Sequence, residues 1–300
     1  MVTQTISRHI QLDIFTNIQP VYICPLNLLT SEKHKYTENR NNTAELGGKK
    51  TEIIRNIYLV SGPPYGTHEN VYVVKGTNAL VMIDTGIDEE ELAVIYENIA
   101  YWGLRDYPIS HVLITHSHYD HCANAHILRK RGANIVAGPS DAEGIELGDD
   151  RTASYAFTHK KGFIPCTVDL KVKDGDIIDA AGLKIEAIHV PGYTKGSMFY
   201  KLITEGKVVL FTGDVVKIVF RQLNFLEPKL GWSGGIDYDR QMYYETLKKI
   251  SSIKADILLP GHLELCVREG WQILQSALTT ARYNWYNVPS MGLYGSKIER

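Results

Sequence analysis

The sequence predicts a fold in which two mixed β-sheets pack together with helices on the outside. Short runs of β-branched and apolar residues, punctuated by glycine and proline, are typical of hairpin strands. Between these runs lie segments with polar starts and apolar residues at helical spacing, which are typical of amphipathic helices. Both patterns occur in both halves of the chain, and this favours two packed sheets with flanking helices.

The first half of the main domain holds clear strand and helix signals. A helix is predicted over 88–100, because acidic residues fill its first turn and Leu92, Ile95 and Ile99 lie at helical spacing. A shorter helix is predicted over 123–131. Strands are predicted where apolar runs meet turn residues or a polar cluster, over 57–60, 70–74, 79–83, 112–114 and 134–137.

The second half repeats this arrangement. Helices are predicted over 238–250 and 270–285, and strands over 176–178, 183–190, 198–203, 207–211 and 257–259. The chain before residue 51 differs, because 30–50 is polar and poor in large apolar residues. We therefore expect residues 1–50 to be an N-terminal extension or linker, and residues 51–300 to form one domain.

The composition argues against several classes of partner. Lys and Arg number 32 against 34 Asp and Glu, and a net charge of −2 gives no reason to expect nucleic acid. No apolar run approaches the roughly 18 residues of a membrane span, and residues 1–20 lack the continuous apolar core of a signal peptide. We expect a cytoplasmic protein with a small-molecule substrate and no membrane or nucleic-acid partner. The oligomeric state stays open, a homodimer included.

Three histidines and an aspartate follow the predicted strand 112–114 within six residues. His116, His118, Asp120 and His121 are hard to explain by packing, because imidazoles this close repel one another when protonated. A divalent cation that binds their lone pairs explains the cluster economically. The alternative is a solvated, histidine-rich turn.

Further polar residues follow other predicted strands. His189 and Tyr193 lie in the segment after one strand, Asp214 ends a second and His262 ends a third. Each alone is weak, since an aspartate at a strand end is more often a turn former and a single histidine more often a surface residue. Their succession after the histidine cluster is the strong signal.

At these motifs the chain resembles the metallo-β-lactamase superfamily. The family's His-x-His-x-Asp-His motif, Pro-Gly-His-Thr turn, Gly-Asp and Gly-His are met in the same order at 116–121, 191–194, 213–214 and 261–262, with one change. Residues 83–86, Ile-Asp-Thr-Gly, resemble the family's early structural turn. The resemblance covers about residues 51–265. It implies an α+β (αβ/βα) sandwich of two mixed β-sheets packed face to face, with a metal site at one edge.

The resemblance also implies a ligand set and an activity. His116 and His118 would bind a first metal, and Asp214 would bridge to a second metal that is bound by Asp120, His121 and His262. The implied cofactors are two divalent cations, zinc first, with iron or manganese as alternatives. A metal-bound hydroxide would then attack an ester, thioester, lactone or amide carbonyl, as in glyoxalase II or lactonases. Asp120 would also orient the hydroxide or take its proton.

Tyr193 is the one departure from the family pattern, because it stands where the family has the turn histidine that binds the first metal. Three interpretations compete. The phenol could bind as a phenolate, its pKa lowered from about 10 by the cation, and such a hard oxygen donor suits iron better than zinc. It could instead leave the first site weak and donate a hydrogen bond to substrate. In the third interpretation, His189 completes the first site.

Two other functions compete with the hydrolase. An iron-dependent oxidoreductase on the same fold is one, and Tyr193 makes iron worth testing. A non-catalytic binding member is the other, although the near-complete ligand set argues against it. Residues 62–68 could form a flap over the metals or an exposed hairpin loop. The long connection after Asp214 could supply an apolar substrate wall through Phe220, Phe225, Trp232 and Tyr238.

Overall fold

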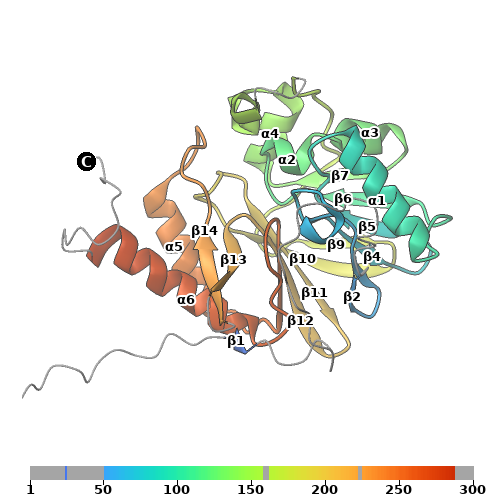
Figure 1. Cartoon of the computed structure of the whole chain (residues 1–300). Helices are drawn as coiled ribbons and strands as arrows, with labels where there is room; N and C mark the ends of the chain where they lie inside the picture. The colour runs from blue at the N-terminus through green and yellow to red at the C-terminus, as the bar shows by residue number, and fades with distance from the viewer. Residues whose placement is uncertain (1–23, 26–50, 158–161, 222–224, 288–300) are drawn as a thin grey trace, which may run out of the picture.

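The computed structural model describes residues 24–25, 51–157, 162–221 and 225–287 (Figure 1). Two β-sheets form a layered core, and helices lie outside it on both sides (Figure 1). The predicted fold class is therefore confirmed. Of the predicted N-terminal extension, the structure describes only Cys24–Pro25, and the rest of 1–50 lies outside the described residues.

The first half of the domain forms a seven-stranded sheet in the order β2-β3-β4-β5-β6-β7-β8. Pairs from β2 to β5 are antiparallel and those from β5 to β8 are parallel. The strands are β2 (Thr51–Ile54), β3 (Ile57–Leu59), β4 (Tyr72–Lys75), β5 (Leu80–Ile83), β6 (Ile109–Leu113), β7 (Asn134–Ala137) and β8 (Leu170–Lys171). The helices are α1 (Glu89–Tyr101), α2 (Tyr119–Cys122), α3 (Ala125–Lys130) and α4 (Pro139–Leu147).

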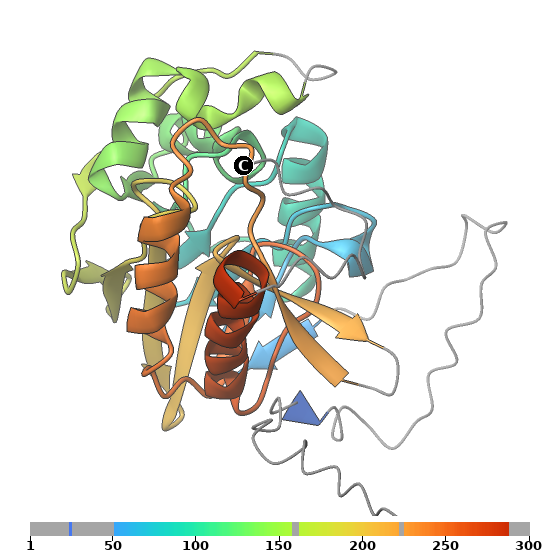
Figure 2. The ribbon, with the colours of Figure 1, turned by 90° about the vertical axis from the view of Figure 1, so that its left-hand side faces the viewer.

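The second half forms a five-stranded sheet in the order β15-β12-β11-β10-β9. All its pairs are antiparallel except β12 with β15. Its strands are β9 (Ile177–Ala180), β10 (Leu183–His189), β11 (Met198–Thr204), β12 (Lys207–Gly213) and β15 (Ile257–Pro260). The helices α5 (Arg240–Ile250) and α6 (Gly270–Arg282) lie side by side against this half (Figure 2).

The segment after Asp214 differs from the prediction, because much of it is a β-hairpin rather than a loop. Its strands β13 (Val216–Arg221) and β14 (Phe225–Leu230) pair antiparallel, and β1 (Cys24–Pro25) pairs with β14 in the same small sheet. The sequence analysis also missed β2, β8 and α4. These elements are short or lack clear periodicity, so the surrounding structure rather than local pattern determines them.

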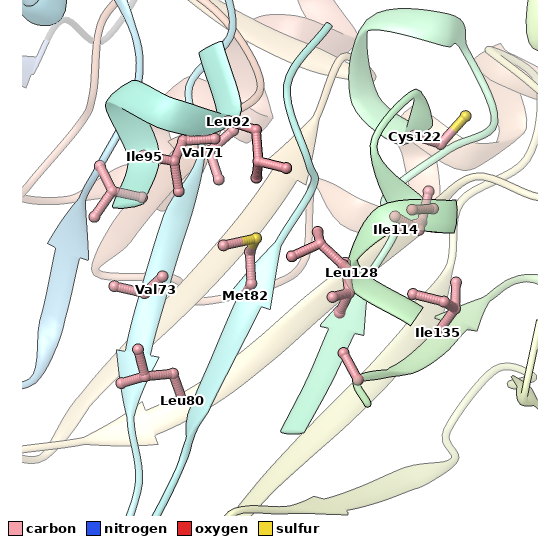
Figure 3. Packing of buried hydrophobic residues seen from close by; sticks show 14 of the residues in the cluster. Val71, Val73, Leu80, Met82, Leu92, Ile95, Ile114, Cys122, Leu128 and Ile135 are labelled. Atoms are coloured by element: carbon pink, nitrogen blue, oxygen red, sulfur yellow. The ribbon is translucent and has the colours of Figure 1, made fainter. Parts of the chain in front are cut away.

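Alternation along β4 explains how the first sheet is buried on both faces. Val71 and Val73 face the helices and pack with residues of α1 such as Leu92 (Figure 3). Tyr72 and Val74 belong to the core between the two sheets. Among the described residues, no helix is long and apolar enough to cross a membrane.

Two buried tyrosines in the layer between the sheets fix strand ends that lead into the predicted metal motifs. The hydroxyl of Tyr200 donates to the carbonyl of Ile114 over 2.8 Å, and that of Tyr72 donates to the carbonyl of Pro260 over 2.7 Å. Ile114 lies two residues before His116, and Pro260 lies two residues before His262. Each bond therefore ties one sheet to the backbone that carries a candidate ligand.

Replacing Tyr200 tests this tie. Tyr200→Phe removes the donor and leaves the buried Ile114 carbonyl without that hydrogen bond, so the free energy of unfolding should fall by about 1–3 kcal/mol. Urea denaturation measures the change, with Tyr286→Phe as control because Tyr286 is 52% exposed. Equal stability of the two variants would contradict the role given to this bond.

Candidate metal centre

The predicted motifs meet at one edge of the two sheets. His116 follows β6 of the first sheet, while Tyr193, Asp214 and His262 follow β10, β12 and β15 of the second. The seven candidate side chains are nearly fully buried: His116, His118, Asp120, His121, Tyr193, Asp214 and His262 are each at most 7% exposed. Buried polar groups at this density need partners or a bound ion.

Four of these residues place one ligand atom each around a common point. His262 Nε2 lies 3.1 Å from His121 Nε2, 3.2 Å from Asp120 Oδ2 and 3.4 Å from Asp214 Oδ1. His121 Nε2 lies 3.5 Å from Asp214 Oδ1 and 3.6 Å from Asp120 Oδ2. Ligand atoms of a tetrahedral zinc with bonds of 2.0–2.1 Å are about 3.3–3.4 Å apart. These five distances are close to the spacing that one cation requires.

Tyr193 and the other histidines form a second group beside the first. Tyr193 Oη lies 3.1 Å from His118 Nδ1 and 3.2 Å from Asp214 Oδ2. The ring of His116 lies between the two groups, 5.0 Å from the ring of Tyr193 and 4.1 Å from that of His121. Its ligand atom lies within 4.8 Å of those of His121 and Asp214. His189 is turned away, because its Nε2 bonds the carbonyl of Lys195 over 2.8 Å. The structure thus brings Tyr193, and not His189, to the centre.

Unpartnered buried atoms at the centre offer the donors that a cation needs. Asp214 Oδ1 and His116 Nε2 have no hydrogen-bond partner among the described residues. The hydroxyl of Thr115 donates to Asp84, so it must accept from His116 Nδ1, and this leaves the lone pair on Nε2. A bare imidazole nitrogen and a bare carboxylate oxygen in a buried site are the donors that a divalent metal takes.

Asp84 orients the histidine loop from the neighbouring strand end. Its carboxylate accepts hydrogen bonds from the Thr115 amide over 2.8 Å, the Thr115 hydroxyl over 2.8 Å and His121 Nδ1 over 2.9 Å. The bond to Nδ1 leaves Nε2 of His121 facing the other ligands, an arrangement common behind metal-bound histidines. In the sequence, Asp84 is marked only as part of a structural turn.

Asp141 holds two loops of the centre by hydrogen bonds. It was not predicted from the sequence. It accepts hydrogen bonds from the Ser117 amide over 2.8 Å, the Thr194 hydroxyl over 2.7 Å and the Gly196 amide over 2.7 Å. Asp141 therefore couples the histidine loop to the turn that carries Tyr193. Its place on α4, a helix without sequence signal, left no pattern to find it by.

Without a cation, the centre balances its own charges. Burial alone would lower the pKa of His121, but the negative charges of Asp120, Asp84 and Asp214 raise it to about 10. Burial alone would raise the pKa of Asp120, but the charges of His121 and His262 lower it to about 2. A metal that binds His121 must displace its proton, so metal affinity should rise with pH through the neutral range.

Lys217 is a second residue that the sequence analysis missed. Its ammonium lies 2.8 Å from Asp214 Oδ2, and its side chain is 12% exposed. It comes from β13, in the connection whose hairpin the sequence did not reveal. Burial alone would raise the pKa of Asp214, but the charges of His262, Lys217 and His121 lower it well below its ordinary value.

The loop between β3 and β4 covers part of the centre. This is the position expected of a flap, the first of the two alternatives predicted for residues 62–68. The ring of His68 lies 5.0 Å from the ring of His262. Glu69, the next residue, is fully buried, and the ligand atoms of His68, Glu69, Asp120 and His262 all lie within 4.8 Å of one another. The sequence placed His68 at the end of this possible flap, but nothing in it marked Glu69 as part of the site.

A cavity of about 300 Å³ opens beside the centre and reaches Asp120, Tyr193 and His262. Its lining also includes two lysines, Lys217 and Lys229, and two aromatic residues, Phe157 and Trp232. Of the four residues predicted as an apolar wall, only Trp232 lines the cavity. Phe220 is 48% exposed, Tyr238 packs against Tyr243, and Phe225 lies opposite Pro25 in the small sheet.

Comparison with known proteins places the chain in a family. The sequence profile of the metallo-β-lactamase superfamily matches residues 64–262. The native FEZ-1 metallo-β-lactamase from Legionella gormanii shares the fold, with a TM-score of 0.61 and 20% identity over 79% of this chain and 94% of that one.

Relatives found by sequence match shorter stretches of the chain. The atrochrysone carboxyl ACP thioesterase AgnL7 of Paecilomyces divaricatus is 27% identical over 193 residues, which are 64% of this chain and 49% of the relative. The hydroxyacylglutathione hydrolase of Pseudomonas paraeruginosa is 29% identical over 111 residues, 37% of this chain and 34% of the relative. The chain thus spans half the length or less of these relatives. With the matched profile covering about two thirds of its length and the sandwich fold in place, the chain belongs to the metallo-β-lactamase superfamily.

Proposed function

We propose that this protein is a metal-dependent hydrolase of acyl thioesters. The carrying observation is the position of Asp214, whose two carboxylate oxygens face two adjacent groups of ligand atoms. Two relatives bear the names of thioester-cleaving enzymes, an ACP thioesterase and a hydroxyacylglutathione hydrolase. Water adds to the thioester carbonyl carbon, the carbon–sulfur bond breaks, and a carboxylic acid and a free thiol are released.

The proposed cofactors are two divalent cations, with zinc as the first choice. His116, His118, Tyr193 and Asp214 Oδ2 would hold the first, and Asp120, His121, His262 and Asp214 Oδ1 the second. When bound, such a pair lowers the pKa of water and polarises the attacked carbonyl. Spacings of 3.1–3.2 Å from Tyr193 Oη to His118 and Asp214 support the phenol as a ligand.

The chain's own residues orient the reacting groups. Asp120 borders the cavity, and its pKa of about 2 keeps it ionised, so its carboxylate accepts a hydrogen bond from the attacking water. Asp84 holds Nε2 of His121 toward the centre. Lys217 supplies a positive charge at the cavity wall, where the carbonyl oxygen becomes negative as water adds.

The cavity lining supports a substrate with an anionic carrier. Lys217 and Lys229 face each other across the β13–β14 pair, and both line the cavity. The name of one relative includes glutathione, a thiol carrier with two carboxylates. Phe157 and Trp232 offer apolar surface for an acyl chain. The substrate class we propose is therefore an acyl group on an acidic thiol carrier.

Thiol release tests the activity. The zinc-loaded protein should release free thiol and carboxylic acid in equal amounts from acyl-glutathione or acyl-coenzyme A, measured with a thiol reagent. The same acyl group on a small neutral thiol should show a higher KM. Asp120→Asn should lower kcat by about 10²–10⁴-fold, whereas Asp179→Asn, an exposed carboxylate on β9, should leave it unchanged. Absence of thiol release from every thioester would refute the proposal.

Metal content tests the ligand set. Asp214→Ala should lose both cations, because one carboxylate serves both groups of ligand atoms. Elemental analysis after dialysis measures this, with Asp174→Ala as a control whose carboxylate pairs with Lys249 away from the centre. Full metal content in Asp214→Ala would show that the ligand assignment is wrong.

Tyr193 distinguishes zinc from iron. A phenolate bound to ferric iron should colour the oxidised protein, and Tyr193→Phe should bleach it, whereas zinc, with its filled d shell, gives no such band. With zinc, Tyr193→Phe should lower occupancy of the first site and Tyr193→His should restore it. Unchanged metal content with a lower kcat would instead make Tyr193 a hydrogen-bond donor to substrate.

A further inference from the structure

The loop over the centre, which we call the flap (residues 61–69), is held by its own hydrogen bonds. The hydroxyl of Thr67 accepts from the Gly62 amide over 2.6 Å and lies 2.7 Å from the hydroxyl of Ser61. Tyr65 Oη donates to the Leu59 carbonyl over 2.9 Å. The flap therefore presents its last residues, His68 and Glu69, to the centre in a defined position.

Glu69 is an unexplained buried carboxyl group at this position. Its side chain is fully buried, and Oε1 lies 2.8 Å from His68 Nδ1. No donor group among the described residues reaches Oε2, and burial together with a hydrogen bond to the Glu91 carboxyl raises the pKa of Glu69 to about 11. The nearby donors are used by Glu91, which accepts from the Ser61 hydroxyl and from the Ile87 amide. In the metal-free protein these two buried carboxyl groups therefore share a proton, which a bound cation would replace.

The surroundings of Glu69 contain the ligands for a cation. Atoms of His68, Glu69, Asp120 and His262 lie within 4.8 Å of one another. Imidazole nitrogens and carboxylate oxygens are the mixed donors that zinc and cobalt accept. Asp120 and His262 also belong to the inner group with His121 and Asp214. The two groups of four therefore share Asp120 and His262. One cation can move from one group to the other while these two ligands stay bound.

With the exception of Glu69, whose side chain is 0% exposed, exposure rises from the inner group to His68. The side chains of His121 and Asp214 are 0% and 4% exposed, those of His262 and Asp120 are 9% and 10%, and that of His68 is 76%. A hydrated cation must exchange its water for protein ligands one at a time. The side chains offer such a sequence, which begins at the exposed imidazole of His68.

We propose that His68, Glu69, Asp120 and His262 form an outer metal site through which the second cation reaches the inner group. This inference rests on the metal centre of the proposed function. His68 captures the cation at the surface, and the carboxyl group of Glu69 exchanges its proton for the cation. Asp120 and His262 then hold it while His121 and Asp214 replace His68 and Glu69.

Loading kinetics of Co²⁺ test the outer site. Metal-free protein is mixed with Co²⁺, and the visible absorption of the bound ion gives the association rate; an excess of chelator then gives the release rate. Glu69→Gln and His68→Ala should slow association of the second equivalent by about tenfold or more. Release should slow by the same factor, and the metal content at equilibrium should stay at the wild-type value.

Two control variants show whether slower loading is specific to the outer site. Glu264→Gln and His126→Ala change the same residue types outside both groups and should load at the wild-type rate. Wild-type loading rates in both flap variants would overturn the proposal and leave Glu69 sharing a proton with Glu91. Faster release with lower metal content would also overturn it, by making Glu69 a permanent ligand or a structural support.

The Co²⁺ experiment distinguishes failure of the outer site from failure of the proposed metal centre. A wild-type protein that binds no Co²⁺ would refute the metal centre itself. A wild-type protein that binds two equivalents, with flap variants that load normally, would remove the outer site alone. His68 is mostly exposed, so His68→Ala should fold normally even where a change at buried Glu69 does not.

Discussion

The centre depends on the carboxylate of Asp214, which lies between two groups of buried ligand atoms. Its Oδ1 faces His121 and His262, and its Oδ2 faces Tyr193 and Lys217. Backbone pairing delivers it there together with His262, since β12 and β15 are parallel and the Gly261 amide donates to the Gly213 carbonyl over 2.8 Å. Any side chain at Gly261 would collide, because a Cβ there would lie 2.5 Å from His121 and 2.9 Å from Asp214.

Two other buried aspartates keep the surrounding loops in register with Asp214. Asp84 ties the start of the histidine loop to β5, and Asp141 ties the same loop to the turn of Tyr193. The two tyrosines between the sheets add bonds to the strand ends at Ile114 and Pro260. These bonds cross between elements that are far apart in sequence, so the rigidity of the centre comes from the sandwich as a whole.

Tyr193 keeps the geometry of the family's centre while it changes the donor. Burial and the charges of Asp214 and Asp120 raise its pKa well above the ordinary value, so without a cation it is a neutral phenol that donates to Asp214. A bound cation reverses this electrostatic balance and favours the phenolate. The same residue can therefore stabilise the metal-free fold and serve as a ligand. On the other side of the centre, the flap places His68 and Glu69 within 4.8 Å of the ligand atoms of Asp120 and His262.

Local pattern by itself determined the α+β class, most strands and helices, and the order of polar residues at strand ends. Those signals are short-range, because hydrophobic alternation and turn residues are read within a few positions. His116, His118, Asp120, His121, Asp214 and His262 could be named for this reason, since each closely follows an apolar strand. Only the tertiary structure showed that Tyr193 lies at the centre and His189 does not. It also revealed Asp84's bond to His121, and the positions of Asp141, Lys217 and Glu69. These residues act through contacts with distant elements or through buried charge. Spacing along the sequence predicts neither.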